Sequence, residues 1–172
     1  AIRVKLIDLD RFPLWEGQFR WVGEPRNYSE DSTPPAVFQG AKLACEPYFT
    51  DWGALGLVHV TGAEIVPKSL YEVQAVSVIC PDLGNQECYS VALRIDTQKW
   101  GDTVSPFASE GAPSQPNFLD IAALVAKFQG KPGAIIKARA QLQPNVPNPA
   151  NLVSFLDIAR CVDAFKGVPY PF

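Results

Sequence analysis

The last third of the sequence contains one segment twice, and this repeat constrains the fold more than any other feature. Residues 118–132 read FLDIAALVAKFQGKP and residues 155–169 read FLDIARCVDAFKGVP, at an offset of 37 residues without a gap. Nine of the fifteen aligned positions are identical. A match this dense indicates a duplicated supersecondary unit. Because duplicated helical units of this size usually bind, dock or scaffold, we expect such a role here.

Each copy predicts one short amphipathic helix. Four apolar residues recur at the spacing of a single helix face, and we expect this stripe to face a core. In the first copy they are Phe118, Ile121, Val125 and Phe128. Gly130 fits the left-handed residue that ends a helix, and the proline two residues later prevents the helix from restarting.

Each repeat unit, residues 117–132 and 154–169, begins with a residue that can cap a helix. These residues are Asn117 and Ser154, and Asp120 and Asp157 follow three positions later. A short acid at that position can reach back to the cap and favours the positive end of the helix. We therefore expect a capping role for both aspartates, with metal binding as the alternative.

The layout of two loop-plus-helix repeats resembles a dockerin type I module, and most closely the divergent dockerin-like tails of some secreted bacterial proteins. In that family a Gly-Asp opens a calcium loop, and an Asp at the end of the loop begins the helix. Gly101 and Asp102 match the opening, and Asp120 matches the end. The resemblance covers residues 101–172. It implies two helices, calcium at Asp102 and Asp120, and docking onto a cohesin-like partner.

The loop residues themselves argue against calcium. Asp102 and Asp120 are 18 positions apart, whereas a calcium loop of this type is about twelve residues long. The second loop offers neutral oxygen ligands only: Asn145, Asn148, Asn151 and Ser154. Calcium needs several hard oxygen ligands that carry negative charge. We therefore expect no required cofactor, and calcium binding that is weak or absent.

Composition disfavours several classes of function. Hydrophobic residues make up 47% of the 172 residues, which predicts a packed core rather than disorder. The net charge is −3 and Lys and Arg are not clustered, which disfavours nucleic-acid binding. No apolar run approaches the roughly 18–20 residues that span a bilayer. Because Met is absent even at position 1, we expect the chain to be cut from a secreted precursor or a larger protein.

The four cysteines predict disulfides rather than a metal site. They lack CxxC spacing, and a single His accompanies them. Their even number favours two bridges in an oxidising compartment. Cys80 and Cys88 flank the turn-forming stretch PDLGNQE and can staple a hairpin, which would leave Cys45 to pair with Cys161. The sequence alone leaves three pairings open.

Residues 1–100 predict an antiparallel β-sandwich. Segments such as IRVKLIDL, LGLVHVTGAEIV and LYEVQAVSVIC alternate apolar and polar residues, and turn-forming residues separate them. Within them, LVHVTGAEIVPKSLYEVQAVSV resembles a region of fibronectin type III-like domains. There a strand ends in an apolar-Pro turn and a tyrosine opens the next strand. The resemblance implies that Tyr71 is a corner tyrosine.

Residue chemistry offers little for catalysis. His59 lies in an alternating strand, and no nucleophile elbow, phosphate loop or zinc motif occurs. Aromatic residues in the first 52 positions indicate core or interface packing, with a sugar-stacking platform as the alternative. They are Trp15, Phe19, Trp21, Tyr28, Phe38, Tyr48, Phe49 and Trp52. Asn27 opens the sequon Asn-Tyr-Ser and is a glycosylation candidate.

The sequence therefore predicts an α+β protein with a β-sandwich over residues 1–100 and a dockerin-like helix pair over residues 101–172. We expect a secreted, non-catalytic, structural or adhesive protein that attaches to another cell-surface protein or assembles with copies of itself. An exposed edge strand would be a template for such assembly. The alternative is a carbohydrate-binding module with a dockerin-like anchor, and hence a polysaccharide partner. The VPYPF tail is expected to pack on its own domain, with docking on a partner as the alternative.

Overall fold

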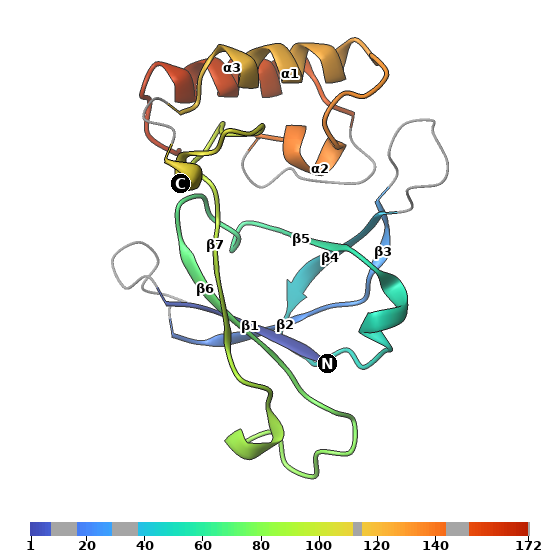
Figure 1. Cartoon of the computed structure of the whole chain (residues 1–172). Helices are drawn as coiled ribbons and strands as arrows, with labels where there is room; N and C mark the ends of the chain where they lie inside the picture. The colour runs from blue at the N-terminus through green and yellow to red at the C-terminus, as the bar shows by residue number, and fades with distance from the viewer. Residues whose placement is uncertain (8–16, 29–37, 112–114, 144–151, 172) are drawn as a thin grey trace.

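The structure is a computed structural model that describes residues 1–7, 17–28, 38–111, 115–143 and 152–171. It is a mixed α+β fold, with a β-rich half below and the three helices gathered above it in Figure 1. The strands are β1 (Ile2–Leu6), β2 (Phe19–Val22), β3 (Arg26–Tyr28), β4 (Phe38–Ala44), β5 (Val58–Thr61), β6 (Leu70–Ala75) and β7 (Leu93–Asp96). The α+β class predicted from the sequence is confirmed.

The seven strands join in one sheet, in the order β3-β4-β2-β1-β6-β7, with β5 paired to β4. β1 lies at its centre and pairs antiparallel with β2 and β6. Alternate residues of β1 point to one side, where Val4 and Leu6 are fully buried. A cluster of apolar residues forms the core on this side of the sheet. It consists of Val4, Leu6, Val22, Ala41, Val66 and Tyr71.

One strand departs from the antiparallel pairing that the sequence predicted. β5 runs parallel to β4, with Gly40 opposite His59. The intervening residues 45–57, which include the 3₁₀ helix η1 (Trp52–Leu55), return the chain to the start of β4 before β5 begins. A connection of this length permits the parallel pair, whereas a tight turn would have forced an antiparallel one.

The corner tyrosine predicted at Tyr71 is confirmed. Its phenol is buried, accepts a hydrogen bond from the N–H of Val66 at 2.8 Å and donates one to the carbonyl of Glu64 at 3.0 Å. These bonds tie the start of β6 to the apolar-Pro turn that precedes it. Lys68, in this turn, has a left-handed φ of 53°.

The helical half contains α1 (Phe118–Phe128), α2 (Lys137–Ala140) and α3 (Phe155–Phe165), so both repeat-derived helices are confirmed. Two further short 3₁₀ helices are η2 (Gln86–Cys88), which lies in the β-rich half, and η3 (Ala108–Glu110), which precedes α1. The helices share a second core. It consists of Leu124, Ala140, Val153, Ile158 and Cys161.

The predicted apolar stripe of the first helix is wrong at both ends. Ile121 and Val125 pack partly against the core, but the Phe118 and Phe128 side chains are 72% and 51% exposed. Asp120 and Leu124 are the buried residues of α1 instead. The reason is that Asp120 turns inward, so the helix presents a different side to the core. Phe165, the equivalent of Phe128, is likewise exposed.

None of the helices within the described ranges is long and apolar enough to cross a membrane.

Candidate functional site

Large apolar side chains are exposed on α1 and α3. Phe118 and Leu119 open α1, Phe155 and Leu156 open α3, and all four side chains are more than half exposed. The ring of Phe118 contacts the ring of Phe165 with centroids 4.9 Å apart, so the start of α1 lies beside the end of α3. The two helices are therefore antiparallel, as Figure 1 shows at the top of the molecule. We call Phe118, Leu119, Phe128, Phe155, Leu156 and Phe165 the helix-pair face.

The hydrogen bonds of Asp120 explain why Phe118 and Leu119 point to solvent. One carboxylate oxygen of Asp120 accepts the backbone N–H groups of Thr103 and Val104 at 2.7 and 3.0 Å, and the other accepts that of Asn117 at 2.8 Å. The carboxylate is fully buried. Because it must reach these inward donors, the two residues that precede it on the first turn project away from the core.

Asp157 repeats this arrangement in α3. One oxygen accepts the backbone N–H groups of Leu142 and Gln143 at 2.9 and 3.3 Å, and the other accepts that of Ser154 at 2.7 Å. Asp157 is also buried. The capping role expected for both aspartates is confirmed, since each forms a capping box with its N-cap residue. The additional anchoring of the preceding loop is not visible in the sequence.

The calcium site implied by Asp102 and Asp120 does not fit the geometry of Asp120. Both Asp120 oxygens face N–H donors, whose partial positive charge already satisfies the carboxylate. Asp102 accepts the N–H of Ala108 through Oδ2 at 2.8 Å, while its buried Oδ1 has no hydrogen-bond partner among the residues that the structure describes. Burial, followed by the neighbouring Asp120 and Glu110 carboxylates, raises the pKa of Asp102 above its usual value.

The positive charge of Lys99 acts on Asp102. The ammonium of Lys99 donates to the backbone carbonyl of Gln115 at 2.5 Å, and its charge acts on Asp102 to oppose the rise of the pKa. Within the described ranges, the buried Oε1 of Gln115 also has no hydrogen-bond partner. One carboxylate and one amide oxygen fall short of the six to eight oxygens of a typical calcium shell. Residues 144–151 of the second loop lie outside the described residues.

The cysteines form one disulfide. Cys80 and Cys88 are bonded across the predicted turn, as expected. The second predicted bridge is wrong, because Cys45 and Cys161 are both free thiols. Cys45 is exposed beyond the end of β4, whereas Cys161 is buried on α3 with its Sγ directed at the Gly101 carbonyl. Burial raises the pKa of Cys161 to about 12.

The aromatic residues near the N-terminus do not share one surface. The guanidinium of Arg3 lies between the rings of Phe19 and Tyr89, 3.7 and 3.2 Å from their centroids. Trp21 lies beside Tyr89 with its ring centroid 6.4 Å away. Tyr48 contacts Trp52 edge to face. Trp15 lies outside the described residues. The aromatics therefore enclose a buried cation at one place and contribute to packing at another.

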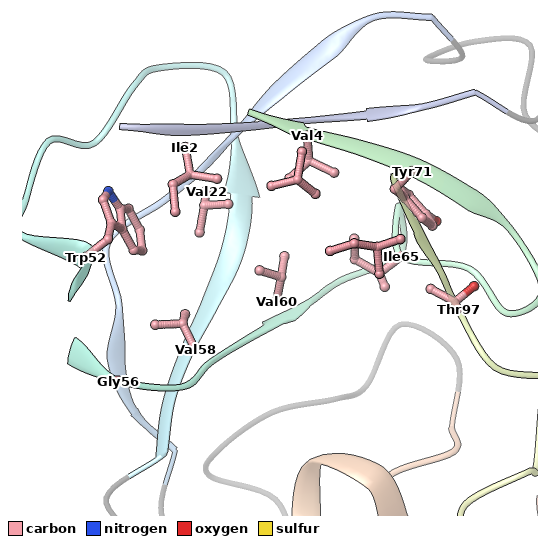
Figure 2. Close-up of a pocket in the computed structure, with 12 residues that line it drawn as sticks. Ile2, Val4, Val22, Trp52, Gly56, Val58, Val60, Ile65, Tyr71 and Thr97 are labelled. Carbon is pink, nitrogen blue, oxygen red and sulfur yellow. The ribbon is translucent and has the colours of Figure 1, made fainter. Parts of the chain in front are cut away.

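An apolar cavity of about 360 Å³ lies on the core side of the sheet. Figure 2 shows aliphatic side chains of β1, β2 and β5 directed into it, with Tyr71 and Thr97 at one end. The hydroxyl of Thr97 donates to the Val66 carbonyl at 2.6 Å, so both polar groups at that end already have protein partners. The cavity thus presents no free polar group from these two residues to a ligand.

Two further sequence candidates, His59 and Asn27, lie in strands. His59 lies in β5 opposite Gly40. Among the residues that the structure describes, no three His, Cys, Asp or Glu side chains form a group able to hold a metal. Asn27 lies in β3 opposite Gln39, and Ser29 of its sequon lies outside the described residues.

Comparison with protein-family models, with curated proteins and with solved structures finds no match to this chain.

Proposed function

We propose that this protein is a non-catalytic, extracellular structural or adhesive protein that docks through the helix-pair face. The proposed partner is a protein with a matching apolar surface, either another cell-surface protein or a copy of this chain. The observation that carries the proposal is the exposure of six large apolar side chains on two short antiparallel helices.

The area of the face supports docking rather than simple surface exposure. Taking about 200 Å² for each full side chain, the six residues together expose on the order of 700 Å². The largest apolar patch on a typical monomer is about 300–600 Å². A standard protein interface buries about 800 Å² on each partner, so the helix-pair face provides most of one side of such an interface.

The proposal also assigns each half of the molecule to a type of domain. We infer that the β-rich half is a divergent fibronectin III-like domain, supported by the Tyr71 corner, and that the helical half is a divergent dockerin-like module. The duplicated helices and the paired aspartates support the second assignment. The disulfide between Cys80 and Cys88 supports an oxidising, extracellular setting.

The test is retention of the labelled protein on intact cells of the organism that produces it, with and without protease treatment of the cells. We expect the double substitution Phe155→Ser and Leu156→Ser to abolish retention, because it removes one end of the face. Val78→Ser with Ile79→Ser is the matched control, since these residues are equally apolar and exposed but lie outside the face. Full retention of the Phe155 and Leu156 variant would refute the proposal. Displacement of the protein by soluble polysaccharide would instead support the carbohydrate-binding alternative.

A further inference from the structure

β7 is an end strand whose outer edge has no partner among the described residues. It pairs only with β6, with Tyr71 opposite Ile95 and Glu72 opposite Arg94. All four residues of β7 are exposed. An uncovered strand edge of this kind is a template for pairing with another chain.

The hydrogen-bonding direction along β7 follows from two bonds at the end of the strand pair. The N–H of Thr97 donates to the Ser69 carbonyl at 2.9 Å, which places Thr97 in a hydrogen-bonded pair with β6. Backbone groups alternate between the two edges of an antiparallel strand. Ile95 therefore also directs its backbone toward β6, whereas Arg94 and Asp96 direct theirs outward. The bond from the Ile7 N–H to the Leu70 carbonyl agrees, because it places the Tyr71 backbone on the β7 side.

The side chains of β7 divide into an apolar row and a charged row. Leu93 and Ile95 lie on the same side of the sheet as their partners Val73 and Tyr71, yet they are 60% and 44% exposed. Arg94 and Asp96 lie on the opposite side. Arg94 contacts Glu72 at 3.4 Å and keeps 69% of its side-chain surface exposed, so it can contact a further acid.

These charges are self-complementary when two copies of β7 pair antiparallel about Ile95. Arg94 of each copy then lies opposite Asp96 of the other, and Ile95 lies opposite Ile95. The residues placed in hydrogen-bonded pairs, Arg94 and Asp96, are the two whose backbone groups point outward. Backbone direction and charge thus select the same register. Opposite charges that face each other across strands are favourable, and like charges are not.

We propose that two copies of this chain associate through β7, so that their sheets join across a two-fold axis at Ile95. The proposal goes beyond the proposed function, because it names a second copy as the partner at a surface separate from the helix-pair face. In an isologous contact of this kind, the outward backbone groups of both β7 edges form hydrogen bonds with each other. Because the contact consists of short strands and a few apolar side chains, its area is at the low end for a specific interface, and we expect a dissociation constant on the order of 100 μM.

The experiment measures self-association by sedimentation equilibrium of the whole chain over a range of concentrations. Arg94→Glu and Asp96→Lys each place like charges opposite one another at two positions, and each should weaken association about tenfold. An equimolar mixture of the two variants should recover wild-type affinity, because every facing pair in the mixed dimer is again of opposite charge. A rearrangement within one chain cannot produce that recovery.

A second measurement tests the register. Ile95→Cys in a Cys45→Ser background should form an intermolecular disulfide under mild oxidation, whereas Val78→Cys in the same background should not. The variant Phe155→Ser and Leu156→Ser should associate through β7 like the wild type, so failure of docking at the helix-pair face and failure of β7 pairing are separable. A wild-type chain that stays monomeric at 1 mM, or a variant mixture no tighter than its components, would overturn the proposal.

Discussion

The indole of Trp100 and the phenol of Tyr170 meet edge to face, with their ring centroids 5.6 Å apart. This contact joins the two halves of the molecule. Tyr170 also packs against the core of the sheet, and the indole N–H of Trp100 points to the Leu142 carbonyl at 3.4 Å. The C-terminal tail therefore packs within this chain, and its Tyr170 contacts the β-rich half rather than only the helical domain to which the sequence analysis assigned the tail.

Tyr170→Ala should lower the free energy of unfolding by roughly 2–3 kcal/mol, because it removes a half-buried aromatic side chain and its edge-to-face partner. Chemical denaturation followed by Trp fluorescence measures this loss. Val168→Ala is the control, since Val168 in the same tail is nearly half exposed, and it should cost less than about 1 kcal/mol. Equal losses would mean that the ring contact does not couple the halves.

Asp157→Asn should be strongly destabilising, by about 2–4 kcal/mol, which exceeds an ordinary cap. The amide keeps one acceptor but directs its NH₂ group at backbone N–H donors in a buried site. Asp163→Asn, which removes only an exposed ion pair with Arg160, should cost less than about 0.5 kcal/mol. Thermal unfolding of the two variants gives the comparison, and similar melting temperatures would contradict the anchoring role of Asp157.

The repeat, the helix caps, the corner tyrosine and the Cys80–Cys88 pair were all accessible from the sequence, because each depends on local spacing. The side that each helix turns toward the core could not be predicted from the sequence. A helical stripe indicates that Phe118 and Phe128 share a side with Ile121 and Val125, but only the long-range bonds from Thr103 and Val104 to Asp120 determine which side is buried. A capping Asp and a capping Asp that also anchors a loop look alike in a sequence.

The same limit applies to the free cysteines and to the β7 edge. An even cysteine count favoured two bridges, yet Cys161 fills a core position on α3, where a small apolar side chain is needed. β7 pairs with β6 and with no second strand among the described residues because it is at the end of the strand order. The alternation of apolar and polar residues along a strand does not determine this order. The sequence shows that Arg94 and Asp96 have opposite charges. It does not show the strand register in which they would face each other across two copies of β7.

Mass spectrometry without reduction should show the loss of two hydrogens, one bridge, rather than four. In the native protein, Cys45 should react with a thiol reagent at pH 8, whereas Cys161 should not, because burial raises the pKa of its thiol to about 12 and blocks access. Both should react at similar rates in denaturant. Rapid labelling of Cys161 without denaturant would show that α3 detaches from the core.

Leu124→Ala should cost about 2–5 kcal/mol, since Leu124 is fully buried in the helical core. Phe128→Ala should cost only about 1 kcal/mol, because half of its side chain is already exposed to solvent. Denaturant titration of both variants separates the two outcomes. A larger loss at Phe128 than at Leu124 would mean that the helix-pair face is a core surface rather than a docking surface.

The last prediction concerns calcium and Asp102. We expect a chelator to leave the melting temperature unchanged, because Asp120 already binds three backbone N–H groups, and added calcium to have no effect. Asp102→Asn should stabilise the protein at pH 7 by about 1 kcal/mol, since it removes a buried charge with an unpartnered oxygen. The folded-state pKa of Asp102 is raised, so its ionisation opposes folding. The wild type should therefore gain stability relative to Asp102→Asn as the pH falls from 7 toward the unfolded-state pKa. A calcium-dependent rise in melting temperature that Asp102→Asn abolishes would show instead that Asp102 binds the ion.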